Sequence, residues 1–174
     1  MTDPIKSAIR VLGIDPGSRL MGFGMVSKNG TKLTTSGYGT LKFNTKVEAN
    51  ERLIEIYDGV RALLEKFKPD HVAIEKVFFA KNVVSALKLG QARGVAVLAV
   101  AQAGIPIYEY SPNEIKLSTV GFGHADKIQV AKMVRLLLGV ENFESADSSD
   151  ALAIAICHLQ THQFRRNLPR GAEL

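Results

Sequence analysis

Apolar and polar residues alternate along the first forty residues in the manner of β-strands. Three segments, residues 10–14, 21–28 and 32–43, read as strands and are separated by glycines. Asn29 and Gly30 lie between the second and third segments, and both residues tolerate the positive φ of a tight two-residue turn. The pattern therefore predicts three successive strands, the last two joined as an antiparallel hairpin.

The hydrophobic period changes further along the chain. Residues 47–67 repeat apolar side chains at steps of three and four, which predicts an amphipathic helix. The short apolar run 71–74 predicts a buried strand, residues 82–103 predict a second helix that is rich in small side chains, and residues 105–110 predict a fifth strand. This alternation of helix and strand is typical of parallel strand pairing.

Capping signals predict two helices after the fifth strand. Ser111, Pro112 and Glu114 would occupy the N-cap, N1 and N3 positions of the first helix. Asp126 and Gln129 have the spacing of a capping box for the second helix.

A last helix is expected from about residue 145 to residue 162. Its apolar run 151–157 also alternates like a strand, but alanine is a poor strand former and an acidic cap precedes the run, which favours a helix. Residues 163–174 show no periodicity, so we expect a mobile tail.

Together these elements predict an α/β fold with a five-stranded mixed sheet, in which an antiparallel hairpin forms one edge and helices flank the parallel strands. A chain of 174 residues is close to the ~150 residues of one domain. We expect residues 1–9 to form an N-terminal extension, residues 10–163 one folded domain, and residues 164–174 a flexible basic tail.

Composition narrows the class of protein. A hydrophobic share of 46% and a charged share of 22% exclude disorder for most of the chain. Cys157 is the only cysteine, which excludes an intrachain disulfide and favours a reducing compartment, by default the cytoplasm. The first ten residues lack the apolar core of a signal peptide, and no run approaches the ~18 apolar residues of a membrane span. We therefore expect a protein that is neither secreted nor embedded in a membrane.

The chain carries a formal net charge of +5 at pH 7. This basic excess suits a polyanionic partner, and nucleic acid is the obvious candidate.

Acidic residues stand where predicted strands end and where the last helix begins. Asp15 follows the first strand in a sharp Asp-Pro-Gly turn, and Glu75 directly follows the buried strand 71–74. Asp147 and Asp150 are three residues apart and would project from one face of the last helix. Alternatives remain for each: an ordinary turn for Asp15, a salt bridge to a nearby lysine for Glu75, and helix capping for the two aspartates.

The four acids together predict a site for a hard cation. Carboxylates without cysteine or histidine partners favour Mg²⁺ or Mn²⁺ over zinc. Four negative charges would be offset by two divalent ions, and two ions ~3.5–4 Å apart can activate a water molecule and stabilise the leaving oxygen at a phosphorus atom. Phosphodiester hydrolysis is the natural reaction of such a site.

Six segments, in the same order along residues 10–162, resemble the RuvC family of crossover junction endodeoxyribonucleases. The segments are 13–19, 22–24, 74–78, 85–94, 125–127 and 146–153. Lys76, Phe79 and the side chains of the loop 121–124 depart from the common family pattern, which affects the expected substrate preference more than the expected chemistry.

The resemblance implies a ribonuclease H-like fold, a homodimer, and resolution of four-way Holliday junctions by paired symmetric nicks in recombination and repair. It implies two Mg²⁺ ions per active site, with Mn²⁺ able to substitute, products with 5′-phosphate and 3′-hydroxyl ends, and cooperation with the RuvA and RuvB branch-migration proteins. The catalytic and metal-binding acids of the family fall on Asp15, Glu75, Asp147 and Asp150. Its base-stacking aromatic residue falls on Phe78 and its important lysines on Lys116 and Lys127, and we expect these three residues and Lys81 to bind DNA.

Two other functions fit parts of the sequence. Asp15 and the glycine-rich hairpin after it also resemble the phosphate-binding turn of actin-like phosphotransferases, but those proteins need two such lobes. A non-catalytic nucleic-acid-binding module would leave the four acids unexplained.

Two helices raise further expectations. The small residues of the helix 82–103, among them Ala92 and Ala96, suggest that it contributes to a dimer interface. His158 and His162 are spaced i, i+4 like half of a zinc site, but we expect them to be packed residues, because no cysteine lies in a matching position and no acid lies between them.

Overall fold

The central feature of the fold is one mixed sheet with the strand order β3-β2-β1-β4-β5. The computed structural model of the chain describes residues 8–76 and 82–167. β1 pairs antiparallel with β2 and parallel with β4, β2 pairs antiparallel with β3, and β4 pairs parallel with β5. The predicted α/β fold with a hairpin at one edge is confirmed. The strands are β1 (Ile9–Asp15), β2 (Leu20–Asn29), β3 (Lys32–Lys42), β4 (His71–Glu75) and β5 (Ile107–Tyr110).

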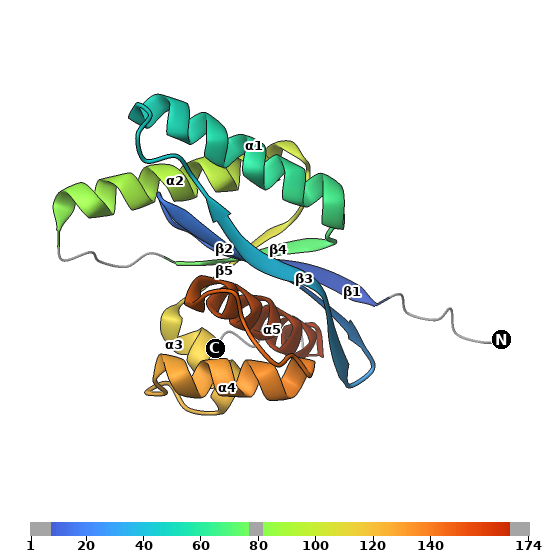
Figure 1. The fold of residues 1–174 in the computed structure, drawn as a ribbon. Coiled ribbons are helices and arrows are strands. Elements are labelled where there is room, and N and C mark those ends of the chain that lie inside the picture. The colour runs from blue at the N-terminus through green and yellow to red at the C-terminus, as the bar shows by residue number, and fades with distance from the viewer. Residues whose placement is uncertain (1–7, 77–81, 168–174) are drawn as a thin grey trace.

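Helices cover both faces of this sheet (Figure 1). One face carries α1 and α2, and the other carries α5, with α3 and α4 packed beyond it. The helices are α1 (Ala49–Phe67), α2 (Val83–Gln102), α3 (Pro112–Val120), α4 (Lys127–Leu138) and α5 (Ala146–Asn167).

Successive side chains of the central strands point into two separate hydrophobic cores, one on each face of the sheet. Val11 of β1 and Ala73 of β4 pack with α5, whereas Leu12 and Ile74 pack with α1 and α2. Because side chains alternate along a strand, the odd-numbered residues of both central strands face α5. The last odd position on each strand is an acid.

The predicted caps of α3 and α4 are confirmed. Ser111 and Glu114 form a capping box at α3, and Asp126 and Gln129 form one at α4. Gly139 closes α4 in the left-handed conformation that favours glycine. These local signals fix where both helices begin and where α4 ends.

Helix α5 is longer than the sequence pattern indicates. It continues to Asn167, so residues 163–167 of the predicted tail are helical. Glutamine and arginine are good helix formers, which favours continuation of the helix beyond residue 162. The expectation that the last helix ends near residue 162 is therefore wrong, because α5 ends at Asn167.

Two expectations concern helix α2. By length and composition alone it could cross a membrane, with a mean hydropathy of 1.5 over an 18-residue window of Val83–Gln102. Its residues Ala92 and Ala96 are fully buried in the core beneath α1 and the sheet. Small side chains serve here to bring the helix close within its own chain, so these two alanines are not available to a second copy.

Candidate active site

Two acids meet at the carboxyl edge of the sheet. β1 and β4 are parallel and in register, with Ile14 paired to Ile74. Asp15 and Glu75 are the next residues on the two strands, so they lie side by side on the face that α5 covers. The glycine and proline after Asp15 turn the chain away and leave the strand end open.

The first turns of α5 add two more acids. The Ser145 hydroxyl accepts a hydrogen bond of 3.2 Å from the backbone N–H of Ser148, which fixes where the helix begins. Asp147 lies directly over Gly22, where a Cβ atom would come within 2.0 Å of the Asp147 carbonyl oxygen. Gly22 is the β2 residue paired with Asp15. A glycine at this position therefore lets α5 bring its acids down onto the strand ends.

A cleft of about 350 Å³ opens over these residues. Its polar lining comes from the carboxylates and from two lysines of α3 and α4, and its apolar lining comes largely from α3, α4 and α5. The polar lining residues are Asp15, Glu75, Asp150, Lys116 and Lys127.

The acids repel one another. Burial, with added repulsion from Glu75, Asp150 and Asp147, raises the pKa of Asp15 to about 7. Burial is also the main cause that raises the pKa of Glu75, with Asp150 adding to it. Carboxylates in such a group either hold protons or need a cation.

Two lysines offset part of the negative charge of these acids. The Lys127 ammonium donates a hydrogen bond of 2.8 Å to the Asp150 carboxylate, and this contact is the largest cause that raises the pKa of Lys127. Lys116 acts in the opposite sense on Glu75 and lowers its pKa. A cation at the first turn of α4 opposes the helix dipole, and the Asp150 carboxylate offsets the charge of Lys127 at this position.

Most of the predicted site residues lie together. The four acids are close enough to interact electrostatically, and Lys116 and Lys127 border the same cleft. Phe78 and Lys81, the two other residues expected to bind DNA, lie outside the described residues.

The sequence reasoning missed Arg93 of α2. Its guanidinium Nε donates a hydrogen bond of 3.2 Å to the backbone carbonyl of Glu75 and pairs with Glu109 at 2.7 Å, so it holds the end of β4 in place. Its position within the segment 85–94, which carries part of the family resemblance, was the available signal.

An α/β fold that gathers carboxylates and lysines at the carboxyl edge of its sheet is typical of one class of protein, the cation-dependent phosphodiester hydrolases. Comparison with known proteins specifies the family. The family model described as "Crossover junction endodeoxyribonuclease RuvC" matches residues 11–158. The chain therefore belongs to the RuvC family.

Individual relatives agree with this assignment. The crossover junction endodeoxyribonuclease RuvC of Chloroflexus aggregans is 50% identical over 154 residues, which are 88% of this chain and 94% of that protein. RuvC of T. thermophilus, solved in complex with a Holliday junction substrate, is 36% identical with a TM-score of 0.85 and covers 90% of this chain and 96% of that one. The yeast mitochondrial Holliday junction resolvase Ydc2, 16% identical over 95% of this chain and 84% of its own, shares the fold with a TM-score of 0.66. The fold is ribonuclease H-like, as the resemblance implied.

Proposed function

We propose that this chain resolves four-way DNA junctions by paired symmetric nicks, with Asp15, Glu75, Asp147 and Asp150 as its catalytic residues. The observation that carries the proposal is the convergence of these acids, from three distant parts of the chain, beside a cleft that two lysines border. Membership of the RuvC family supports the choice of substrate.

The donor set fits Mg²⁺, with Mn²⁺ as a substitute. The described groups at the cleft offer carboxylate oxygens and no sulfur or imidazole, which is the preference of hard cations. Asp15 and Glu75 have raised pKa values in the metal-free protein, so a bound cation would stabilise their charged forms and displace protons from these carboxyl groups into solvent. When bound, two such ions activate a water molecule and stabilise the leaving oxygen of a phosphodiester.

We infer that Lys116 and Lys127 contact DNA phosphates beside the scissile bond, because both are cations that line the acidic cleft. Lys127 would then exchange its Asp150 partner for a phosphate once cations neutralise the carboxylates. Phe78 and Lys81 are proposed to bind DNA at the branch point on the strength of the resemblance.

The decisive assay offers the full-length protein a labelled four-way junction and a linear duplex of equal length. With Mg²⁺ or Mn²⁺ we expect nicks at symmetry-related positions of two opposing strands of the junction, and ends that a DNA ligase can rejoin. With a chelator we expect binding without cutting. Equal cutting of the linear duplex, or symmetric nicking in the chelator, would contradict the proposal.

We also propose that the active form is a homodimer. A four-way junction has approximate two-fold symmetry, and one chain contributes one acidic cleft, so paired cuts need two copies. The exposed side of α2 is a reasonable contact because Val84, Leu87 and Leu98 are 60%, 63% and 51% exposed there.

The cellular setting follows from the same reasoning. A nuclease of this family would act on DNA in the cytoplasm, and the resemblance favours work beside the RuvA and RuvB branch-migration proteins. Capture of RuvA or RuvB on the junction-bound protein is the measurement that checks this partnership.

A further inference from the structure

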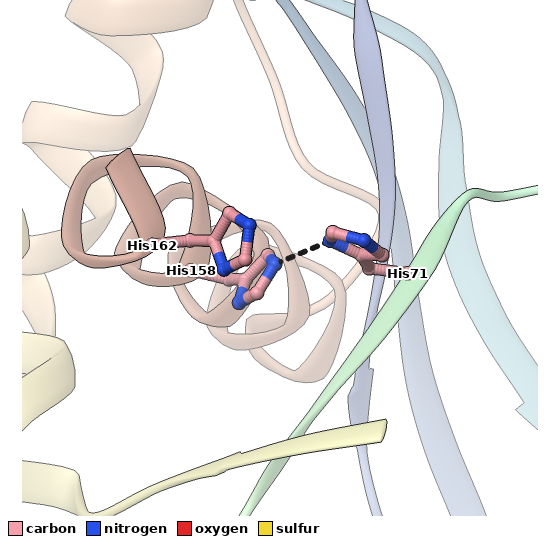
Figure 2. Close-up of side chains that lie close together, drawn as sticks. All are labelled: His71, His158 and His162. Carbon is pink, nitrogen blue, oxygen red and sulfur yellow. Dashed lines mark hydrogen bonds between the residues drawn. The ribbon is translucent and has the colours of Figure 1, made fainter. Parts of the chain in front are cut away.

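A second cluster of metal-ligating side chains lies at the other end of β4 and α5. His71 is the first residue of β4 and Glu75 is the last, while His158 and His162 follow Asp147 and Asp150 of α5 by about two to four helical turns. Figure 2 shows the three imidazoles side by side, with the rings of α5 turned toward the ring of the strand. This cluster is separate from the carboxylate cleft, because β4 runs between them.

The imidazole nitrogens are already close to the spacing of metal ligands. One nitrogen from each of the three rings lies within 4.8 Å of the other two. His71 Nδ1 and His158 Nε2 are hydrogen-bonded at 2.9 Å. Nitrogens of a tetrahedral zinc site are ~3.3 Å apart, given Zn–N bonds of ~2.0–2.1 Å. Small side-chain rotations would therefore bring all three nitrogens to the distances that one ion requires.

Neighbouring tyrosines hold the cluster in this orientation. The Tyr110 hydroxyl and His158 Nδ1 share a hydrogen bond of 2.8 Å, which leaves His158 Nε2 directed at His71. The ring of Tyr108 packs against that of His158, with centroids 4.4 Å apart. A ligating histidine whose second nitrogen is held by an outer hydrogen bond is the usual arrangement in protein metal sites.

We propose that His71, His158 and His162 bind one transition-metal ion of the Zn²⁺ type. Three imidazoles without a carboxylate select a borderline ion such as Zn²⁺ over Mg²⁺, so the ligand chemistry separates this site from the carboxylate cleft. A water molecule would complete the tetrahedron. His71 and His162 are only partly buried, which gives the ion a path from solvent.

The protonation states suit an ion. Burial lowers the pKa of His71, so its ring is more readily neutral than an exposed histidine. The ion would replace the proton shared by His71 Nδ1 and His158 Nε2, and His71 would carry a proton on Nε2 instead. This exchange of tautomer needs no net loss of a proton from the neutral rings.

Binding would join two elements that are far apart in the sequence. His71 and His158 are 87 positions apart, and their shared ion would fasten the start of β4 to the second half of α5. Helix α5 also carries Asp147 and Asp150, so the ion would stabilise the element on which half of the catalytic acids stand.

The test is calorimetric titration of the metal-stripped full-length protein with ZnCl₂ in the presence of excess Mg²⁺. We expect one Zn²⁺ per chain, with affinity at least ~10-fold weaker in His162→Gln and in His71→Gln. His124→Gln is the matched control, because His124 is the fourth histidine of the chain and lies exposed in the loop before α4. Asp15→Asn should retain the site.

Co²⁺ gives a second readout that does not depend on affinity. A four-coordinate nitrogen site produces an intense visible absorption that carboxylate-bound Co²⁺ lacks, and the two histidine variants should lose it while melting cooperatively in a chelator. The proposal fails if Zn²⁺ does not bind, if the histidine variants bind it as the wild type does, or if Asp15→Asn abolishes the binding.

Discussion

Three causes raise the pKa of the Asp15 carboxyl group: its burial, the neighbouring acid on the next strand, and the two acids on the helix above. We expect Asp15→Asn to abolish junction cutting, by at least ~10³-fold, because the amide cannot supply the charge that a divalent ion requires. Junction binding should survive, since the lysines at the cleft remain. Single-turnover cleavage and gel-shift assays on the same preparation measure both properties, and undiminished nicking would contradict the assignment.

The raised pKa of Asp15 also predicts a pH dependence of stability. Its pKa is 3.8 in an ordinary environment and about 7 in the folded, metal-free protein, so the folded state binds the proton more tightly than the unfolded state. The stability gained from this proton is complete below pH ~4 and is lost as the pH rises through ~7. Asp15→Asn should therefore become more stable than the wild type, by on the order of 2–4 kcal/mol above pH ~7.

Thermal melts of both proteins in a chelator, from pH 4.5 to 8, check this dependence. Both proteins contain His71, whose lowered pKa affects stability in the opposite sense. The difference between the two melting temperatures therefore reports the contribution of Asp15 alone. Mg²⁺ should reduce the difference. A difference that does not change with pH would contradict the inferred protonation of Asp15.

At the scale of elements, the contact of α5 with β1 depends on one missing side chain. A Cβ atom on Gly13 would lie 2.0 Å from the Ala151 carbonyl oxygen and 2.9 Å from the Ala155 nitrogen. We expect Gly13→Ala to destabilise the fold by about 3 kcal/mol or more, because a helix backbone must move to admit the methyl group. Gly123→Ala, whose nearest neighbour is 4.0 Å away, should change stability by less than ~0.5 kcal/mol in the same urea titration.

The exposed side of α2 carries the prediction about assembly. Leu87→Glu should shift the sedimentation profile from dimer toward monomer, because a buried charge at an apolar contact costs several kcal/mol. Ile54→Glu on α1 is the matched control, since Ile54 is 61% exposed and Leu87 is 63% exposed. A Leu87→Glu protein that remains a dimer would exclude this side of α2 as the contact.

Elements were predictable where their signals are local, and contacts were not. Capping residues such as Ser111 and Asp126 act on their own helix, so they mark where α3 and α4 begin. The acids were predictable because strand ends and helix starts are recognisable in the sequence. The histidine cluster was not, because nothing local to His158 indicates that His71 will lie 2.9 Å away. That contact depends on how α5 crosses the sheet. The crossing depends in turn on Gly13 and Gly22, where a Cβ atom would collide with the backbone of α5.

At the scale of the whole molecule, a net charge of +5 coexists with an acidic cleft. The lysines at its border therefore matter more for DNA binding than the average charge does. In the Asp15→Asn background, we expect Lys116→Ala to reduce the slope of log affinity against log salt by about 1, the loss of one phosphate contact. Lys32→Ala, at the hairpin end far from Asp15, should leave the slope unchanged in junction titrations between 50 and 200 mM salt. An unchanged slope in Lys116→Ala would remove that residue from the DNA interface.

Strand β4 separates the two proposed ion sites by a known length. Four residue steps at ~3.3 Å each place the backbones of its first and last residues ~13 Å apart. Mn²⁺ held by the carboxylates and Cu²⁺ held by the imidazoles would form a pair of unpaired-electron centres at a fixed spacing. Magnetic dipolar coupling between them would then show, in solution and without an attached label, that both ion sites are occupied in the same molecule.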